Sequence, residues 1–169
     1  MALTITSRGR ATLAWLLKTR DLWLAVGTGA STWPMPQPPP VADAAVGLVN
    51  PIGLVRLVAA DFVRPVTTGG AFQTDDGSNW AYAAAGEDTA HLCLDFRLGP
   101  ADLIDADALN GVREWQLVCD PELAPGVPPG QRVVPIANVV NFGRPLAIEN
   151  TVPSYRAGVD EVRRYVITP

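Results

Sequence analysis

The feature that most constrains the fold of this chain is a run of five prolines within the seven residues from Pro34 to Pro40. Proline has no backbone N–H and a fixed φ angle, so this run forms neither a helix nor a central β-strand. Before it lies the apolar segment Leu22–Val26, whose side chains predict a strand. Gly27 and Gly29 stand between the two and leave the backbone free to bend. The chain is therefore expected to leave a strand and enter an extended proline-rich arm.

The residues upstream of this strand predict a short helix from Ser7 to Lys18, with Ser7 as the N-cap. After the cap, the polar residues of this segment are Arg8, Arg10, Thr12 and Lys18. A helix with so few polar positions is expected either to be largely buried or to face a partner.

The downstream chain consists of short, often alternating runs that are separated by turn-forming residues, which predicts β-strands. The strongest turn signal, Asp75–Ser78, lies between two runs as in a hairpin. The predicted strands are Leu54–Val66, Ala71–Gln73, Asn79–Tyr82, Thr89–Leu98, Val112–Val118, Arg132–Val140, Pro145–Asn150 and Val162–Thr168, with a loop at Pro121–Gly130.

Strands at this spacing indicate a mainly β fold. We expect an antiparallel β-sandwich or open barrel with a short N-terminal helix and an extended Pro-rich arm. A length of 169 residues fits one β-rich domain. In that domain residues 1–40 would hold the helix, strand and arm, and residues 41–169 the β-sandwich body.

The charge of the chain limits its partners. The net charge is −4, which argues against nucleic acid, because binding phosphates needs clustered Lys and Arg. No run of about 18 uncharged apolar residues exists, so we expect no membrane insertion. Charged residues make up 18% of the chain, below the usual quarter, which suggests that partners cover part of its surface.

Metal and enzyme sites have weak support in the sequence. The candidate metal ligands are His91, Cys93 and Cys119, but the close ligand pairs of structural zinc sites are missing. The two cysteines are expected to be buried, and the sequence leaves open whether they pair. The chain has one histidine and no Gly-x-Ser-x-Gly motif, and its Gly-x-Gly lacks a third glycine. We therefore expect no enzyme activity, metal or cofactor.

An interface with a partner protein has better support. Trp33 beside the prolines offers rigid apolar area at a low entropic cost, and a polyproline arm can lie in a groove of a neighbour. Arginines on strand faces can pair with acids across such a contact. The predicted interface residues are Trp33, Pro34, Pro36, Pro38, Pro39, Pro40, Arg56 and Arg64.

Several short segments of the chain follow one another in an order that is typical of one family. The first is the strand ending in Val26-Gly-Thr-Gly29, with Trp33-Pro34 and the prolines after it. Val112-Arg-Glu-Trp-Gln-Leu117 and Gly143-Arg-Pro-Leu-Ala-Ile-Glu-Asn150 follow downstream. In this order they resemble baseplate wedge and tail-fibre-attachment proteins of contractile-tailed bacteriophages. The family's Arg-Glu-x-Gly-Leu segment has a glycine where this chain has Gln116.

The resemblance implies a structural protein of the virion tail that is assembled in the cytoplasm of the bacterial host. Its implied partners are other tail and baseplate proteins and copies of itself in a symmetric assembly, joined through the arm and loops. Two alternatives remain open. One is a carbohydrate- or receptor-binding β-sandwich module of a tail tip, and the other is a small metal-dependent enzyme built on His91 and the cysteines.

Overall fold

A computed structural model describes residues 4–34, 47–99, 102, 111–151 and 161–169. The chain divides into two compact units. Unit 1 comprises Met1–Arg20, Val58–Asp95 and Arg163–Pro169, and unit 2 comprises Asp21–Leu57 and Phe96–Val162. The prediction of one domain stays a prediction.

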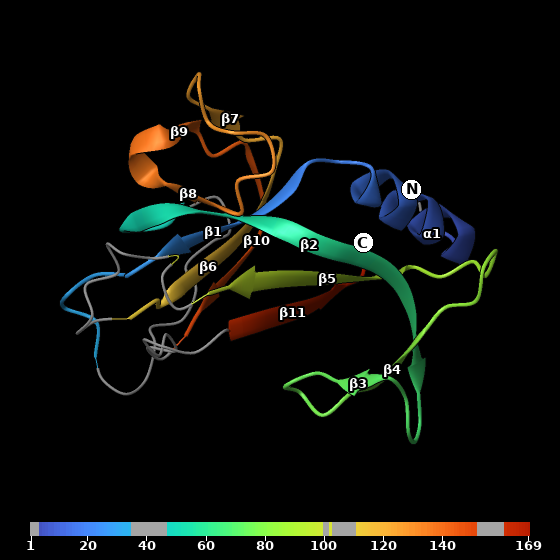
Figure 1. The fold of residues 1–169 in the computed structure, drawn as a ribbon. Coiled ribbons are helices and arrows are strands. Elements are labelled where there is room, and N and C mark those ends of the chain that lie inside the picture. Colours follow the sequence, from blue (N-terminus) through green and yellow to red (C-terminus); the bar gives the residue numbers. More distant parts are fainter. Residues whose placement is uncertain (1–3, 35–46, 100–101, 103–110, 152–160) are drawn as a thin grey trace. The chain divides into compact units, whose positions relative to one another are not determined.

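The fold is mainly antiparallel β with a short N-terminal helix, as predicted, and the described strands do not close into a barrel (Figure 1). Its elements are α1 (Ser7–Lys18), β1 (Leu22–Gly27), β2 (Pro51–Val66), β3 (Phe72–Gln73), β4 (Asn79–Tyr82), β5 (His91–Leu98), β6 (Glu114–Cys119), β7 (Glu122–Leu123), β8 (Val133–Pro135), the 3-10 helix η1 (Ile136–Asn138), β9 (Val139–Asn141), β10 (Arg144–Asn150) and β11 (Glu161–Ile167).

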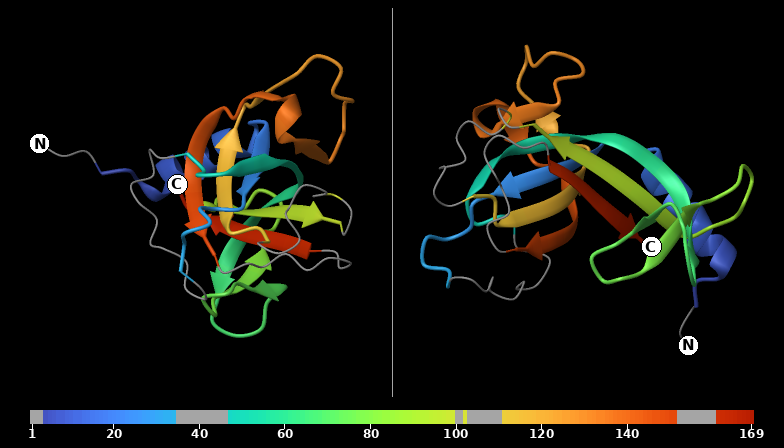
Figure 2. Two further views of the ribbon diagram at one scale, coloured as in Figure 1. Left: turned by 90° about the vertical axis from the view of Figure 1, so that its left-hand side faces the viewer. Right: turned by 60° about the horizontal axis from the view of Figure 1, so that its bottom comes forward.

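In unit 2 the apolar strand β1 lies inside the sheet. The strand order is β10-β6-β1-β2, with antiparallel pairing throughout, and Figure 2 shows β10, β6 and β1 side by side. Trp23 of β1 is opposite Arg56 of β2 on one side and Val118 of β6 on the other. All six residues of β1 are buried, because the strand has a paired neighbour at each edge and apolar side chains on both faces.

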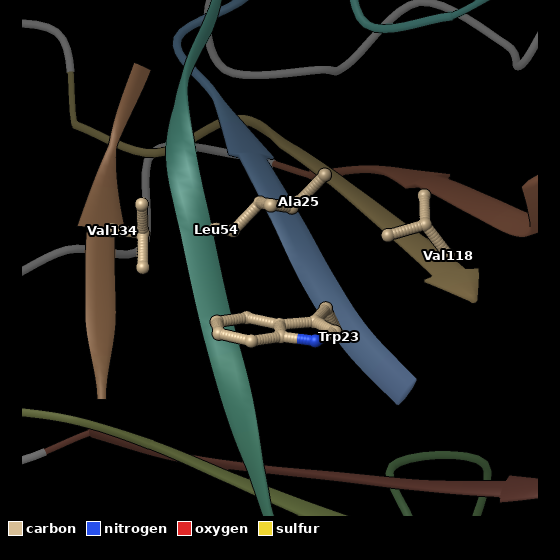
Figure 3. Packing of buried hydrophobic residues seen from close by; sticks show 5 residues of the cluster. All are labelled: Trp23, Ala25, Leu54, Val118 and Val134. Atoms are coloured by element: carbon tan, nitrogen blue, oxygen red, sulfur yellow. The ribbon is translucent and has the colours of Figure 1, made fainter. Parts of the chain in front are cut away.

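The core of unit 2 forms on one face of this sheet (Figure 3). Trp23 and Ala25 share that face of β1, as the alternation predicts. They form a buried cluster with Leu54, Val118 and Val134, which come from β2, β6 and β8. Such close packing fixes the sheet, since removing a buried Trp side chain costs about 3–5 kcal/mol.

Unit 1 contains the predicted hairpin. Strands β3 and β4 pair around the turn, with Phe72 opposite Trp80. β4 also pairs with the end of β2 from Val63 to Val66. Strand β5 pairs with β2 and β11. The alternation predicted for β5 is confirmed, because its apolar positions Leu92, Leu94, Phe96 and Leu98 are all buried.

The helix α1 has the predicted bounds but a different cap. Thr6 is the N-cap, and its Oγ1 accepts a hydrogen bond from the backbone N–H of Gly9 at 3.1 Å. The prediction of Ser7 is wrong by one residue, because Thr6 and Ser7 stand side by side and both residue types are favoured N-caps. Of the helix residues, Ala14 alone is buried. The expectation of a largely buried helix is therefore wrong, and the alternative, that it faces a partner, stays a prediction.

Two predictions for the downstream part of unit 2 are also corrected. The run Arg132–Val140 is not one strand, because η1 interrupts it between β8 and β9. The proline-rich segment Pro121–Gly130 is not all loop, since β7 lies within it and pairs with β9. The 3-10 helix η1 has three residues and the strand β7 has two, so neither is long enough to produce a periodic pattern in the sequence.

Candidate functional site

The described start of the proline-rich segment is held by a glycine and a tryptophan. Gly29 has a φ angle of +69°, which other residues rarely adopt. A Cβ atom at this position would lie 2.5 Å from the Trp33 ring, so the indole packs directly on the bare backbone of Gly29. The N–H of Trp33 donates to the carbonyl oxygen of Ala30 at 3.0 Å, which closes the turn between them. Trp33 is thus placed by a turn that requires glycine.

Arg113 also contacts this tryptophan. Its guanidinium carbon lies 5.3 Å from the centre of the Trp33 ring, within cation–π distance. Its Nη2 donates a hydrogen bond to the carbonyl oxygen of Pro34 at 3.0 Å. Arg113 is only 5% exposed, although it carries a charge. The side chain therefore fixes both the ring and the backbone at the point where the prolines begin.

Glu114, the next residue, holds the segment where it returns. Its Oε2 accepts hydrogen bonds from the backbone N–H groups of Gly29 at 3.0 Å, Val49 at 3.1 Å and Asn50 at 3.2 Å. Its Oε1 accepts from Val49 at 2.9 Å. The residue is 1% exposed, and a buried carboxylate is tolerated only when hydrogen bonds replace its water. Glu114 thus ties residue 29 to residues 49 and 50.

Hydrogen bonds between the residues around Gly29 and Asn50 reinforce the connection that Glu114 makes. The N–H of Thr28 donates to the carbonyl oxygen of Asn50 at 3.0 Å, and Asn50 Nδ2 donates to Thr28 Oγ1 at 2.5 Å. The N–H of Arg113 donates to the carbonyl oxygen of Gly27 at 2.9 Å. A side chain at Gly27 would collide with Glu114, because its Cβ would lie 2.6 Å from Oε2. The site therefore needs glycine at two positions of the Gly-x-Gly motif.

These contacts together form what we call the arm root. It consists of Gly29, Trp33, Pro34, Val49, Asn50, Arg113 and Glu114, all in unit 2. The segment 35–46 lies between two groups of these residues in the sequence. Two consecutive residues, Arg113 and Glu114, hold the chain on both sides of it.

Sequence reasoning missed the roles of Arg113 and Glu114. It identified them only as part of a segment that resembles a family motif. The available signal was a charged pair within an apolar run, Val112-Arg-Glu-Trp115, where buried charges need partners. Those partners lie 64 to 85 positions away for Glu114 and 79 for Arg113, so the sequence alone does not name them.

Two of the six predicted interface residues in the proline-rich segment lie in the part of the chain that the structure describes. Trp33 is half-buried and Pro34 is exposed, and both belong to the arm root. The remaining prolines of the prediction, Pro36, Pro38, Pro39 and Pro40, lie outside the described residues. The structure does not test their role, and the predicted partner contact stays a prediction.

The two predicted arginines lie elsewhere. Arg56 is half-buried in unit 2, with its guanidinium 4.1 Å from the centre of the Trp23 ring and its Nε donating to the Gln131 carbonyl at 3.3 Å. Arg64 is exposed in unit 1, with its Nε 3.6 Å from Oε1 of Glu87. Arg56 is thus already engaged within the protein, whereas Arg64 remains accessible.

The candidate metal ligands show no metal-binding geometry. Among the described residues, no group of three His, Cys, Asp or Glu side chains could hold a metal ion. Nδ1 of His91 lies 2.7 Å from Oγ1 of Thr168, and burial lowers the pKa of this histidine. Cys93 and Cys119 are buried free thiols. Burial and the nearby Asp95 raise the pKa of Cys93 to about 12, so this thiol stays protonated.

Comparison with known proteins adds an independent observation. In the described part of the chain, no helix has the length and apolar character needed to cross a membrane. A comparison with curated proteins gives no match. A family model described as "Baseplate wedge 3 tail fiber network component" matches residues 1–168, almost the whole chain. The chain therefore belongs to the family of baseplate wedge 3 tail fiber network components, and its place is in the tail of a phage virion.

Proposed function

We propose that this protein is a structural connector of a contractile-tail baseplate. It joins neighbouring baseplate or fibre proteins through its proline-rich arm and loops, in several symmetric copies, and it is assembled in the cytoplasm of the bacterial host. Its role is structural rather than catalytic. The family supports the coarser statement that the chain is a component of the baseplate and tail fibre network.

The observation that carries this proposal is the arm root. The protein buries a guanidinium and a carboxylate, Arg113 and Glu114, in order to fix the two sides of one segment. Burying charge is costly, and the hydrogen bonds that offset the cost here run to the backbone of this segment's two flanks. Their effect is to set where the segment 35–46 starts and ends. A protein gains from a fixed root when the segment above it has to meet a partner in a defined position.

The composition of the segment supports the same role. In the polyproline II conformation each residue advances about 3.1 Å, so the six residues 35–40 would reach about 19 Å from Pro34. Such a segment loses little entropy on binding, because proline restricts it beforehand. Between Asp21 and Arg56 the one charged residue is Asp43. A stiff segment with a single charged residue is suited to an apolar groove of a neighbouring subunit.

Helix α1 offers a second contact surface. Leu13, Trp15 and Leu16 are exposed, and Leu16 is 48% exposed. A surface helix normally buries its apolar stripe, so exposed apolar residues at three nearby positions mark an interaction surface. We infer that neighbouring baseplate proteins cover this surface in the assembled tail.

The proposal is tested by assembly of tails with altered arms. A phage whose gene carries Pro36→Ala, Pro38→Ala, Pro39→Ala and Pro40→Ala is expected to produce incomplete baseplates, seen by electron microscopy of purified tails. The matched control changes the exposed loop prolines Pro128 and Pro129 to Ala. The purified variant should retain the melting temperature of the parent, so that a defect in the tails reflects assembly and not folding. Normal tails from the arm variant would refute the connector role.

A further inference from the structure

Unit 1 contains an open groove of about 800 Å³ beside α1. One wall is the face of α1 that carries Trp15, and the opposite wall is the segment Tyr82–Thr89 that follows β4. Figures 1 and 2 show this segment passing beside the helix. Phe62 of β2 also lines the groove. All these residues belong to unit 1, so the groove is complete within that unit.

The groove is lined by aromatic side chains and by small residues. Trp15 is 56% exposed and Tyr82 is 49% exposed, so both rings present apolar area to a ligand. Three successive alanines, Ala83–Ala85, form much of the opposite wall and leave room between the rings. Rings spaced by small residues form the kind of surface that binds the ridges of a polyproline helix.

Four of the five charged side chains that line the groove have a contact within unit 1. Arg8 Nε lies 3.8 Å from Oδ2 of Asp88, and the Lys18 ammonium lies 4.8 Å from the centre of the Phe62 ring. Oε2 of Glu87 accepts from the N–H of Ala84 at 2.9 Å. These pairings leave a groove that favours an uncharged ligand over a strongly acidic or basic one.

We propose that this groove receives the segment Pro34–Pro40 of a second copy of this chain. The inference rests on the proposed function and names the neighbour and the receiving site. The segment has the chemistry that the groove selects, because it contains five prolines and no charge. Pro36-Gln-Pro-Pro39 also has the Pro-x-x-Pro spacing, which places two prolines on one side of a polyproline helix.

The length and position of the segment favour a partner in another copy. The residues that flank it, Pro34 and Gly47, are both exposed, and twelve residues lie between them. Each copy thus carries one arm and one groove, which are different surfaces. Such a contact is heterologous, and it closes into a ring when the rotation between copies is right. This arrangement agrees with the symmetric copies of the proposed function.

The test uses two full-length variants that damage opposite sides of the contact. Trp15→Ala removes an aromatic wall of the groove and leaves the arm unchanged. The fourfold proline-to-alanine variant at positions 36, 38, 39 and 40 alters the arm and leaves the groove unchanged. Each variant alone is expected to self-associate at least about tenfold more weakly than the parent in analytical ultracentrifugation. A 1:1 mixture is expected to regain heterodimers, because the arm of one variant fits the groove of the other. Val58→Ala, at an exposed apolar residue of unit 1 that does not line the groove, is the control and should associate normally.

The outcomes separate the inference from the proposed function. A mixture that does not regain association, a parent that stays monomeric, or a Trp15→Ala variant that associates normally overturns the inference. A fourth outcome also overturns the inference. In it, an oligosaccharide quenches the tryptophan fluorescence of the parent, a synthetic Trp33–Val41 peptide does not, and the quenching by the oligosaccharide is lost in Trp15→Ala. That result would assign the groove to a glycan. If the proline variant still fails to build tails in any of these cases, the connector role stands and the arm binds another protein.

Discussion

Arg113 donates a hydrogen bond to the carbonyl oxygen of Pro34 at 3.0 Å, across 79 positions of the chain. The neighbouring Glu114 binds backbone N–H groups on both sides of the same segment. Arg113 and Glu114 therefore fix the backbone on both sides of the proline-rich segment.

Glu114→Gln is expected to destabilise the protein by about 1–3 kcal/mol. The amide would place an NH₂ group against backbone N–H groups that now donate to a carboxylate, so at least one buried donor would lose its partner. Urea denaturation followed by circular dichroism measures the change. Glu122→Gln is the control, because Glu122 is exposed, and it should change stability by less than about 0.5 kcal/mol. Equal effects of the two substitutions would contradict the role assigned to Glu114.

Gly29→Ala is expected to cost more stability than Gly69→Ala. The two glycines have nearly the same φ angle, +69° and +70°, so the strain of adding a side chain is similar. Only Gly29 lies against a ring, and its new Cβ would force Trp33 to move. We expect about 1 kcal/mol for Gly69→Ala and about 2–4 kcal/mol for Gly29→Ala, measured by thermal denaturation. A Gly29→Ala variant as stable as Gly69→Ala would show that Trp33 does not pack as described.

The sequence predicted the elements with a clear local period. Leu92, Leu94, Phe96 and Leu98 alternate over eight residues, and one strand with that buried face follows directly. The apolar run of β1 likewise predicted a strand, and the hairpin β3–β4 followed from its turn residues. These features depend only on neighbours in the chain.

The arm root could not be predicted from the sequence, because its contacts join residues that are far apart in the chain. Glu114 lies in an apolar run, and nothing near it in sequence indicates that Val49 and Asn50 would be its donors. The sheet register places Arg56 opposite Trp23, whose ring it covers, a contact that the sequence did not indicate, and its contact with a partner stays a prediction. Register between distant strands decides both cases, and the sequence of one strand does not contain it.

Arg164→Lys is expected to destabilise the protein by about 1–2 kcal/mol. Arg164 donates to both oxygens of Asp95, from Nε at 2.6 Å and from Nη2 at 2.8 Å, and this pairing raises the pKa of Arg164. Its guanidinium also lies 4.4 Å from the centre of the Phe72 ring. Lysine has a single ammonium and cannot bind both oxygens side by side. Chemical denaturation measures the loss, and Arg10→Lys on the exposed side of α1 should have almost no effect.

The stability of the protein is expected to fall as the pH decreases below about 6.5, in part because of His91. Burial lowers the pKa of His91 from 6.5, so the unfolded chain binds a proton at a higher pH than the folded protein does. The contribution of neutral His91 is complete above pH 6.5 and decreases as the pH falls towards the folded-state pKa. Denaturation in urea at several pH values from 5 to 8 measures this slope.

His91→Gln should reduce the slope between pH 6.5 and 5, since glutamine does not titrate in this range. Carboxylates contribute the same slope to both proteins, so the difference between the two curves isolates the histidine. A parent and a variant with parallel curves would mean that the pKa of His91 is not lowered in the fold.

The most direct test of the arm as a connector is the oxidation of Met35. The chain has two methionines, and Met35 lies inside the proline run while Met1 provides an internal reference. Hydrogen peroxide converts an accessible methionine to its sulfoxide, which mass spectrometry detects in both isolated protein and purified tails. We expect Met35 to oxidise at least about tenfold more slowly in tails than in the isolated protein, because a neighbouring subunit covers the arm. Equal rates of Met35 oxidation in the two samples would contradict the account.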